Sequence, residues 1–178
     1  MTEIGVRLLE EEDWSEYRDV RLRALSESPE AFVASADEEQ AFPEDSWRAR
    51  MRRSRRLLAE REGSVVGVAS MGSHRSPEEG VGELFGLWVA PDQRGHGVAR
   101  RLLEAAAQQA RQDRLTHLVY WVGTDNGRAV AFASSFGFRP TDSRRPMQIR
   151  GLDGEDEESE EMAMVLPLGS STGMPTSL

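Results

Sequence analysis

Residues 83–99 constrain the fold more than any other part of this 178-residue chain. They read ELFGLWVAPDQRGHGVA, which is an apolar strand, a turn at Pro91 and a glycine loop that opens a helix. The helix is indicated by apolar residues at four-residue spacing: Val98, Leu102, Ala106 and Ala110. A strand that leads through a short loop into an amphipathic helix is typical of α/β domains.

The remaining pattern predicts one mixed α/β domain over residues 1–168 and a disordered polar tail over residues 169–178. Strands are expected near residues 4–9, 56–61, 64–70, 81–89, 115–122 and 162–166. Further helices are expected from Asp13, near residues 46–53 and near residues 129–136. Asp13 and Glu16 predict a capping box, and Glu62-Gly63 predicts a hairpin turn. The acidic run at residues 155–161 is expected to be a solvated loop.

The composition excludes several classes of protein. The chain has no Cys, which rules out disulfides, thiolate metal sites and a Cys nucleophile. Its net charge of −9 argues against nucleic acid as a partner, because that binding needs a basic face. No apolar run approaches the roughly 20 residues that cross a bilayer. We therefore expect no membrane partner and a cytoplasmic location, and the scattered His residues predict no metal site.

The loop itself predicts an anion site. Gly95 and Gly97 lack a Cβ, so a ligand can approach the backbone there, and the first N–H groups of the following helix have no intrahelical acceptor. A pyrophosphate suits such a loop, although a simple flexible helix cap is an alternative interpretation. A P-loop is excluded because its Gly, Lys and Ser/Thr pattern is missing, and Arg100 occupies the third glycine position of a dinucleotide-binding loop.

Two blocks of residues then resemble a known family. The chain reads Val89-Ala90-Pro91 followed by Arg94-Gly95-His96-Gly97-Val98-Ala99, and later Asn126-x-x-Ala129 with Phe136-Gly137-Phe138. This pattern resembles the acetyl-CoA signature and the later block of the Gcn5-related N-acetyltransferases (GNAT), with matching element order over residues 4–166. The resemblance implies a mixed α/β fold with a largely antiparallel central sheet, flanked by helices on both faces.

The resemblance also implies an activity and a set of site residues. The expected reaction moves an acetyl group from acetyl-CoA, as cosubstrate, to a primary amine by direct attack in a ternary complex. The main chain of residues 95–100 would hold the pyrophosphate, the end of the strand would pair with the pantetheine arm and line the acetyl group, and Asn126 would hydrogen-bond that arm. The cofactor-binding residues are therefore expected to be Leu87, Trp88, Val89, Arg94, Gly95, His96, Gly97, Val98, Ala99, Arg100 and Asn126.

The expected general base is Glu83, a carboxylate in an otherwise apolar strand. Its alternative is a structural Glu at the exposed start of that strand. Ala133 stands where many members of the family carry a Tyr that serves as the acid. This departure leaves open a second function, a non-catalytic acyl-CoA-binding module used for sensing or assembly. The acceptor is expected to be a small-molecule, peptide or protein amine, and a homodimer stays an open alternative.

Overall fold

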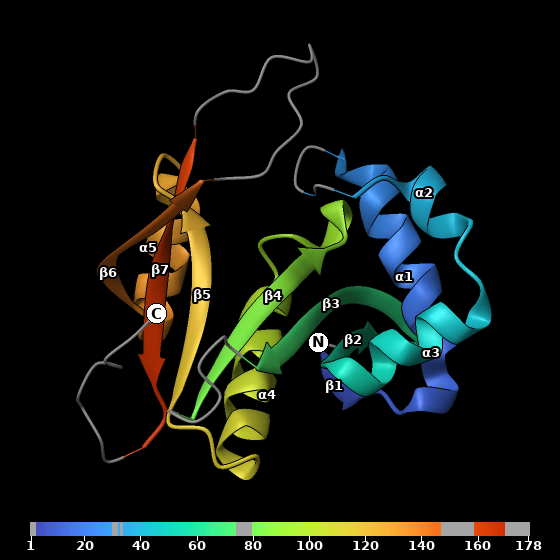
Figure 1. The fold of residues 1–178 in the computed structure, drawn as a ribbon, viewed down its shortest axis with the longest axis horizontal. Coiled ribbons are helices and arrows are strands. Elements are labelled where there is room, and N and C mark those ends of the chain that lie inside the picture. The colour runs from blue at the N-terminus through green and yellow to red at the C-terminus, as the bar shows by residue number, and fades with distance from the viewer. Residues whose placement is uncertain (1–2, 30–31, 33, 74–79, 147–158, 170–178) are drawn as a thin grey trace.

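A computed structural model describes residues 3–29, 32, 34–73, 80–146 and 159–169. Its centre is a seven-stranded sheet in the order β1-β2-β3-β4-β5-β7-β6 (Figure 1). The strands are β1 Gly5–Leu8, β2 Arg55–Arg61, β3 Ser64–Ser73, β4 Val81–Val89, β5 His117–Gly123, β6 Arg139–Pro146 and β7 Glu160–Pro167. Every neighbouring pair is antiparallel except β4 and β5, which run parallel. The expected mixed, largely antiparallel sheet is confirmed.

Helices cover both faces of this sheet, as expected. They are α1 Trp14–Glu27, α2 Ala36–Gln40, α3 Glu44–Arg53, α4 Val98–Gln112 and α5 Gly127–Phe136. α4 and α5 lie behind the sheet in Figure 1 and bury the larger apolar core against it. α1 and α3 pack on the opposite face over β2 to β4, where Trp47, Leu58 and Trp88 form a second core. We call this opposite face the α1–α3 face.

The predicted turn between β2 and β3 is confirmed. Glu62 and Gly63 have φ angles of 53° and 78°, and Arg61 pairs with Ser64 across them. Two consecutive positive φ angles define the turn whose twist matches that of a β-hairpin. Gly63 adopts this conformation without the steric cost of a Cβ.

Three local predictions differ from the structure. Asp13 does not cap α1 through its side chain; its carboxylate accepts from the Glu10 N–H at 2.8 Å and closes a 3-10 turn, Glu11–Asp13. β6 was missed because it is a polar strand at the edge of the sheet, with alternating exposure and a Pro at position 140. The acidic run is partly strand, since β7 begins at Glu160, whereas residues 155–158 and 170–178 lie outside the described residues.

β4 and β5 separate after a short paired region. Their parallel pairing runs from Val81 with His117 to Leu84 with Tyr120, and the strands then diverge (Figure 1). β4 also carries a bulge, since its register against β3 shifts between Val68 and Ser70 while Gly86 has a φ of +62°. The later half of β4 is thus hydrogen-bonded to β3 on one side and parts from β5 on the other.

Candidate active site

Two helices begin at the edge where β4 and β5 have separated. Parallel strands place their carboxyl ends at the same edge of a sheet, and ligands of α/β proteins commonly bind there. β4 is followed by the 3-10 turn Pro91–Gln93 and then by α4, whose N-cap is Gly97. β5 is followed by α5, whose N-cap is Asn126. Both helix N-termini, with their positive dipole ends, therefore lie at this edge.

The glycine loop is open and rich in unpaired donors. Gly95 and Gly97 have φ angles of +81° and +86°, and a Cβ built on either would meet nothing within 4 Å. Gly97 provides no side-chain cap to α4. Among the described residues, no group accepts a hydrogen bond from the N–H groups of Val98, Ala99 or Arg100, the first three residues of the helix. This arrangement fits an oxyanion in contact with the main chain.

The side chains of the loop have structural partners of their own. The Arg94 guanidinium folds back, with Nε donating to the Val89 carbonyl at 3.1 Å and Nη2 to Ser28 Oγ at 3.3 Å. Arg94 thereby fixes the loop to the end of β4 and to the C-terminal end of α1. The side chain of His96 is exposed. Arg100 lies 3.8 Å from Glu104 and is also exposed, so it remains available to a phosphate at this edge.

At the end of β4, the main chain is more accessible to a ligand than the side chains are. The Trp88 indole is 3% exposed, donates from Nε1 to Ser28 Oγ at 3.3 Å and packs in the core beneath α1. Leu87 and Val89 pack against the core on the α4 side. Of the expected contributions of residues 87–89, only those of the main chain fit this burial of Trp88. What remains available to a ligand is the main chain of β4 beyond its pairing with β5.

Asn126 has a role that the sequence pattern did not reveal. Its Oδ1 accepts a hydrogen bond from the Ala129 N–H at 3.2 Å, so it is the N-cap of α5. The side-chain amide still has its Nδ2 donors, and the residue is exposed. Asn126 can therefore cap the helix through its oxygen and donate to a ligand through its nitrogen.

Glu83 lies on the α1–α3 face of β4, in register with Val119 and one residue before the last β4–β5 pair. Its side chain is 24% exposed, and its Oε1 lies 3.7 Å from Arg145 Nη2. Arg145 also pairs with Glu161 and stacks over the Trp121 ring at 4.1 Å. Glu83 is thus a partly exposed carboxylate, oriented by a guanidinium, beside the point where the strands separate. Sequence reasoning missed Arg145 because it lies on β6, the strand that the pattern did not show.

These elements match a known family over most of their length. The model of the "Acetyltransferase (GNAT) family" matches residues 9–138, which includes the glycine loop and both helix N-termini. The chain belongs to the GNAT family. Nine curated proteins match it significantly, as do 503 chains of solved structures.

Two of the relatives that this GNAT chain matches in sequence are bacterial. It is 32% identical over 90 residues to the uncharacterized N-acetyltransferase YuaI of Bacillus subtilis, which covers 50% of this chain and 52% of YuaI. It is 34% identical over 95 residues to a mycothiol acetyltransferase of Acidothermus cellulolyticus, covering 47% of this chain and 29% of that protein. The chain therefore matches about half, or less, of the length of these relatives.

Solved structures share the GNAT fold over nearly the whole chain. A GNAT-family acetyltransferase of Streptococcus pneumoniae superposes with a TM-score of 0.74 at 20% identity, covering 94% of this chain and 100% of the other. The putative acetyltransferase yncA of Salmonella typhimurium, solved with its cofactor acetyl-CoA, gives a TM-score of 0.71 at 20% identity, with coverages of 98% and 99%. At this identity the likeness shows the fold.

This GNAT domain differs from the family pattern at Ala133, which is buried in α5. A tyrosine lies on β5, where the strands separate: Tyr120 forms the last pair with β4, and its ring packs into the core on the α4 side and edge-on against Phe138, with 6.0 Å between ring centroids. Its hydroxyl forms no hydrogen bond with a described residue, and burial raises the pKa of Tyr120. The hydroxyl is therefore protonated at neutral pH.

The described residues contain no group of three or more His, Asp or Glu side chains arranged to hold a metal ion. Within the same residues, no helix has both the length and the apolar character needed to cross a membrane.

Proposed function

We propose that this chain is an acetyl-CoA-dependent N-acetyltransferase that acts on a primary amine. The observation that carries the proposal is the meeting, at one edge of the sheet, of the glycine loop, the N-terminus of α4 and the separated end of β4. Membership of the GNAT family supports the same conclusion. The N–H groups of Val98, Ala99 and Arg100 would hold the pyrophosphate of acetyl-CoA, with Gly95 and Gly97 allowing its close approach.

The pantetheine arm would lie along β4 where it leaves β5. Main-chain groups of residues 87–89 would hydrogen-bond its amides as an added strand does. Asn126 would donate to the arm from Nδ2 while its Oδ1 keeps capping α5. Main-chain N–H groups at the bulge around Gly86, where the β3–β4 register shifts, would polarise the thioester carbonyl.

Glu83 would accept the proton of the attacking amine, directly or through a water molecule. An alkyl ammonium with a pKa near 10.4 costs about 4.6 kcal/mol to present as a neutral amine at pH 7, from about 3.4 units at 1.36 kcal/mol each. A positioned base offsets part of that cost. The new C–N bond forms as the C–S bond breaks, and the leaving thiolate takes a proton from water or from the Tyr120 hydroxyl. A thiolate of this kind, with a pKa roughly like that of Cys at 8.5, leaves without a strong acid.

The experiment that tests this proposal measures turnover. The protein is incubated with acetyl-CoA and a panel of primary amines, while thiol release and acetylated product are followed by absorbance and mass spectrometry. We expect thiol release that depends on the amine and an equal amount of acetylated amine. Tight binding of acetyl-CoA with no thiol release above hydrolysis for any amine would favour the acyl-CoA-binding module instead.

A further inference from the structure

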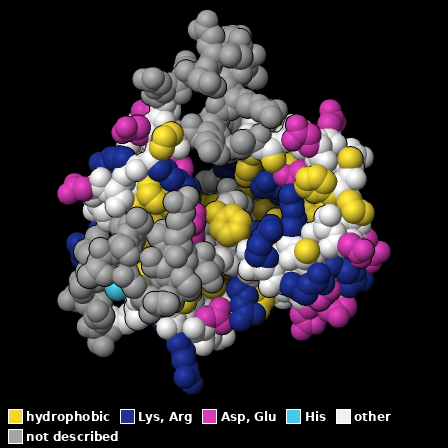
Figure 2. Space-filling model, viewed as in Figure 1, with side chains coloured by type: hydrophobic (Ala, Val, Ile, Leu, Met, Phe, Trp, Pro, Cys, Tyr) yellow, Lys and Arg dark blue, Asp and Glu magenta, His cyan; other side chains and the backbone are white. Residues whose placement is uncertain are grey.

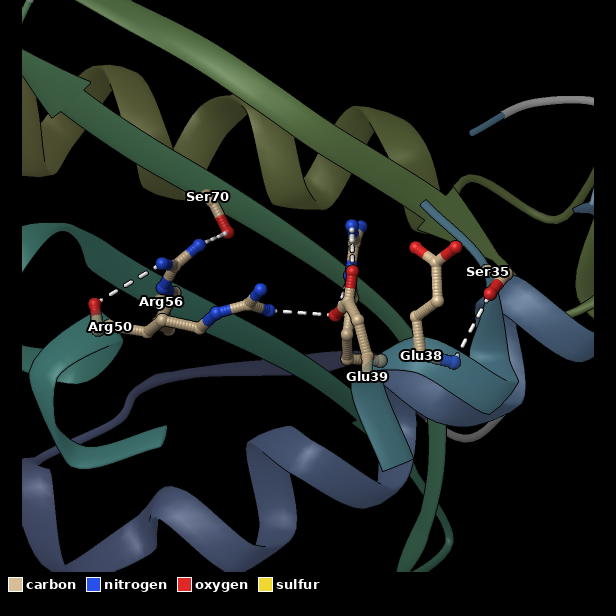
Figure 3. A network of polar contacts seen from close by, with 7 residues as sticks. Ser35, Glu38, Glu39, Arg50, Arg56 and Ser70 are labelled. Atoms are coloured by element: carbon tan, nitrogen blue, oxygen red, sulfur yellow. Dashed lines mark hydrogen bonds and ion pairs between the residues drawn. The ribbon is translucent and has the colours of Figure 1, made fainter. Parts of the chain in front are cut away.

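A buried guanidinium lies on the α1–α3 face, away from the proposed acetyl-CoA edge. Arg56 in β2 is 3% exposed. Its Nη1 donates to Ser70 Oγ at 2.7 Å, and its Nη2 donates to the Arg50 carbonyl at 3.2 Å (Figure 3). Its Nε is buried without a hydrogen-bond partner. Buried charges are normally paired, yet no carboxylate of the described residues pairs with Arg56.

The neighbouring charges do not balance Arg56. Arg21 Nε and Arg50 Nη1 both bind Glu39 Oε1, at 3.2 Å and 2.7 Å, and Glu39 is itself 2% exposed. Figure 3 shows that the Arg50 guanidinium reaches toward Glu39 and that of Arg56 toward Ser70. Arg21, Arg50 and Arg56, which we call the arginine cluster, therefore place three positive charges against one carboxylate. Burial, together with the charges of Arg50, Arg53 and Arg21, lowers the pKa of Arg56. An anion would relieve this imbalance.

The arginine cluster is aligned with the proposed base. Arg56, Ser70 and Phe85 are in register across β2, β3 and β4, and Glu83 lies two residues before Phe85 on the same face. Strand spacings of about 4.8 Å and rises of about 3.3 Å per residue put the Cα atoms of Arg56 and Glu83 roughly 12 Å apart. The Arg56 guanidinium extends toward β4 and lies 5.5 Å from the centre of the Phe85 ring, so the two charged groups are closer together than their Cα atoms.

The surface between the arginine cluster and Glu83 is partly apolar. Phe85 is 37% exposed although it lies between two charged groups. Figure 2 shows exposed hydrophobic side chains next to blue basic ones, all Arg in this chain, at the centre of the face shared with Figure 1. Side chains of Arg21 and Arg50 keep 19% and 21% of their surface exposed, so they present accessible donors. The Phe85 ring lies on the Arg56 guanidinium, and because the ring is partly exposed its side chain can change rotamer rapidly.

We propose that the arginine cluster binds an anionic group, a carboxylate or a phosphate, on the acceptor whose amine meets Glu83. The inference rests on the proposed function and names its substrate class: a primary amine with an oxyanion several bonds away. The guanidinium groups of Arg50 and Arg56 would hold the oxyanion, and the Phe85 ring would contact the chain that links it to the amine. An α-amino acid, whose carboxylate is next to its amine, is too short for this span.

Three acceptors with the same linker test the proposal: 6-aminohexanoate, 6-aminohexyl phosphate and 6-aminohexan-1-ol, each at saturating acetyl-CoA. We expect kcat/KM at least tenfold higher for an anionic acceptor than for the alcohol, and the better of the two identifies the oxyanion. Arg50→Gln should reduce this preference to about twofold or less. Arg52→Gln is the matched control, because it is on the same helix and also loses one ion pair, to Glu11, outside the cluster. It should keep the preference.

A binding measurement separates this inference from the proposed function. 6-Aminohexanoate is titrated by calorimetry into protein saturated with CoA, so that the glycine loop is occupied and cannot bind the probe. Binding to the parent that weakens at least tenfold in Arg50→Gln, and not in Arg52→Gln, supports the arginine cluster. Acetylation of all three amines with equal kcat/KM would contradict anion binding by the arginine cluster and would leave the proposed acetyl transfer standing. Cluster-dependent binding with no acetylation of any amine would support the cluster and contradict the proposed reaction.

Discussion

Replacing Glu83 by Gln tests the role of the base. The substitution keeps the size of the side chain and its oxygen acceptor but removes its ability to take a proton. Loss of a general base typically lowers the rate about 10²–10⁴-fold, or about 2.7–5.4 kcal/mol at 1.36 kcal/mol per factor of ten. We expect kcat at pH 7 to fall by that amount, with little change in the affinity for acetyl-CoA.

The structure predicts that the loss of stability will be much smaller. The contact between Glu83 and Arg145 is 3.7 Å long, and both side chains are partly exposed. Such a pair contributes about 1 kcal/mol or less. Arg145 also keeps its contacts with Glu161 and Trp121 in the variant. A fall in kcat of a hundredfold or more thus cannot be attributed to unfolding, which circular dichroism would check.

Glu161→Gln is the matched control, since it removes a carboxylate from the same guanidinium and leaves the proposed base in place. Its kcat should stay within a few-fold of the parent. The deficit of Glu83→Gln should also shrink toward pH 10, where an amine with a pKa near 10.4 arrives largely neutral. Equal losses in both variants, or a parental kcat for Glu83→Gln across pH 6–10, would refute the role of Glu83 as base.

Three further outcomes are expected. Asn126→Asp keeps the N-cap acceptor and should weaken CoA binding measured by calorimetry without loss of stability, whereas Asn126→Ala should also lose about 1 kcal/mol of folding free energy; unchanged affinity in both would remove Asn126 from the site. Burial raises the pKa of Glu39, but the bonds from Arg21 and Arg50 outweigh it and set this pKa below its usual value. Glu39 therefore stabilises the fold above the unfolded pKa of about 4.3, and that contribution disappears as the pH falls through the folded pKa. Denaturant titration should show that Glu39→Gln is less stable than the parent by about 3 kcal/mol at pH 7 and that this difference in unfolding free energy is smaller below pH 4. A difference that does not change with pH would contradict the role of Glu39. Tyr120→Phe should lower kcat if the Tyr120 hydroxyl protonates the leaving thiolate. A kcat equal to that of the parent would assign this proton to water.

The glycine loop and the helix that it opens could be predicted because their signals are local in sequence. An apolar strand, Pro91, two glycines and a helix with four-residue apolar spacing each depend on residues close together in the chain. The left-handed conformation of Gly97 also depends on nearby residues only, because the chain turns there between a strand and a helix. These features led to the family from the sequence, and the family match confirms that the chain belongs to it.

The α1–α3 face could not be predicted in the same way, because it depends on long-range packing. Arg56 becomes buried only when α1 and α3 cover β2, and Arg145 reaches Glu83 only because β6 joins the far edge of the sheet. Strand alternation alone would put Phe85 and Trp88 on opposite faces. The bulge at Gly86 adds a residue between them, so both lie on the α1–α3 face and the Trp88 indole enters the core.

The central claim is that the glycine loop binds the pyrophosphate of acetyl-CoA. Its most direct test compares, by calorimetry, the affinity of Gly97→Asp and Gly97→Asn for acetyl-CoA. Both side chains tolerate a positive φ, and neither meets an atom within 4 Å at Cβ, so the two variants differ in charge alone. A charge about 4 Å from the pyrophosphate costs roughly 1–4 kcal/mol, depending on solvent exposure. We predict that acetyl-CoA binds Gly97→Asp at least tenfold more weakly than Gly97→Asn, and that this difference in affinity becomes smaller at high salt. Equal affinities in the two folded variants would contradict the assignment of this loop as the pyrophosphate site.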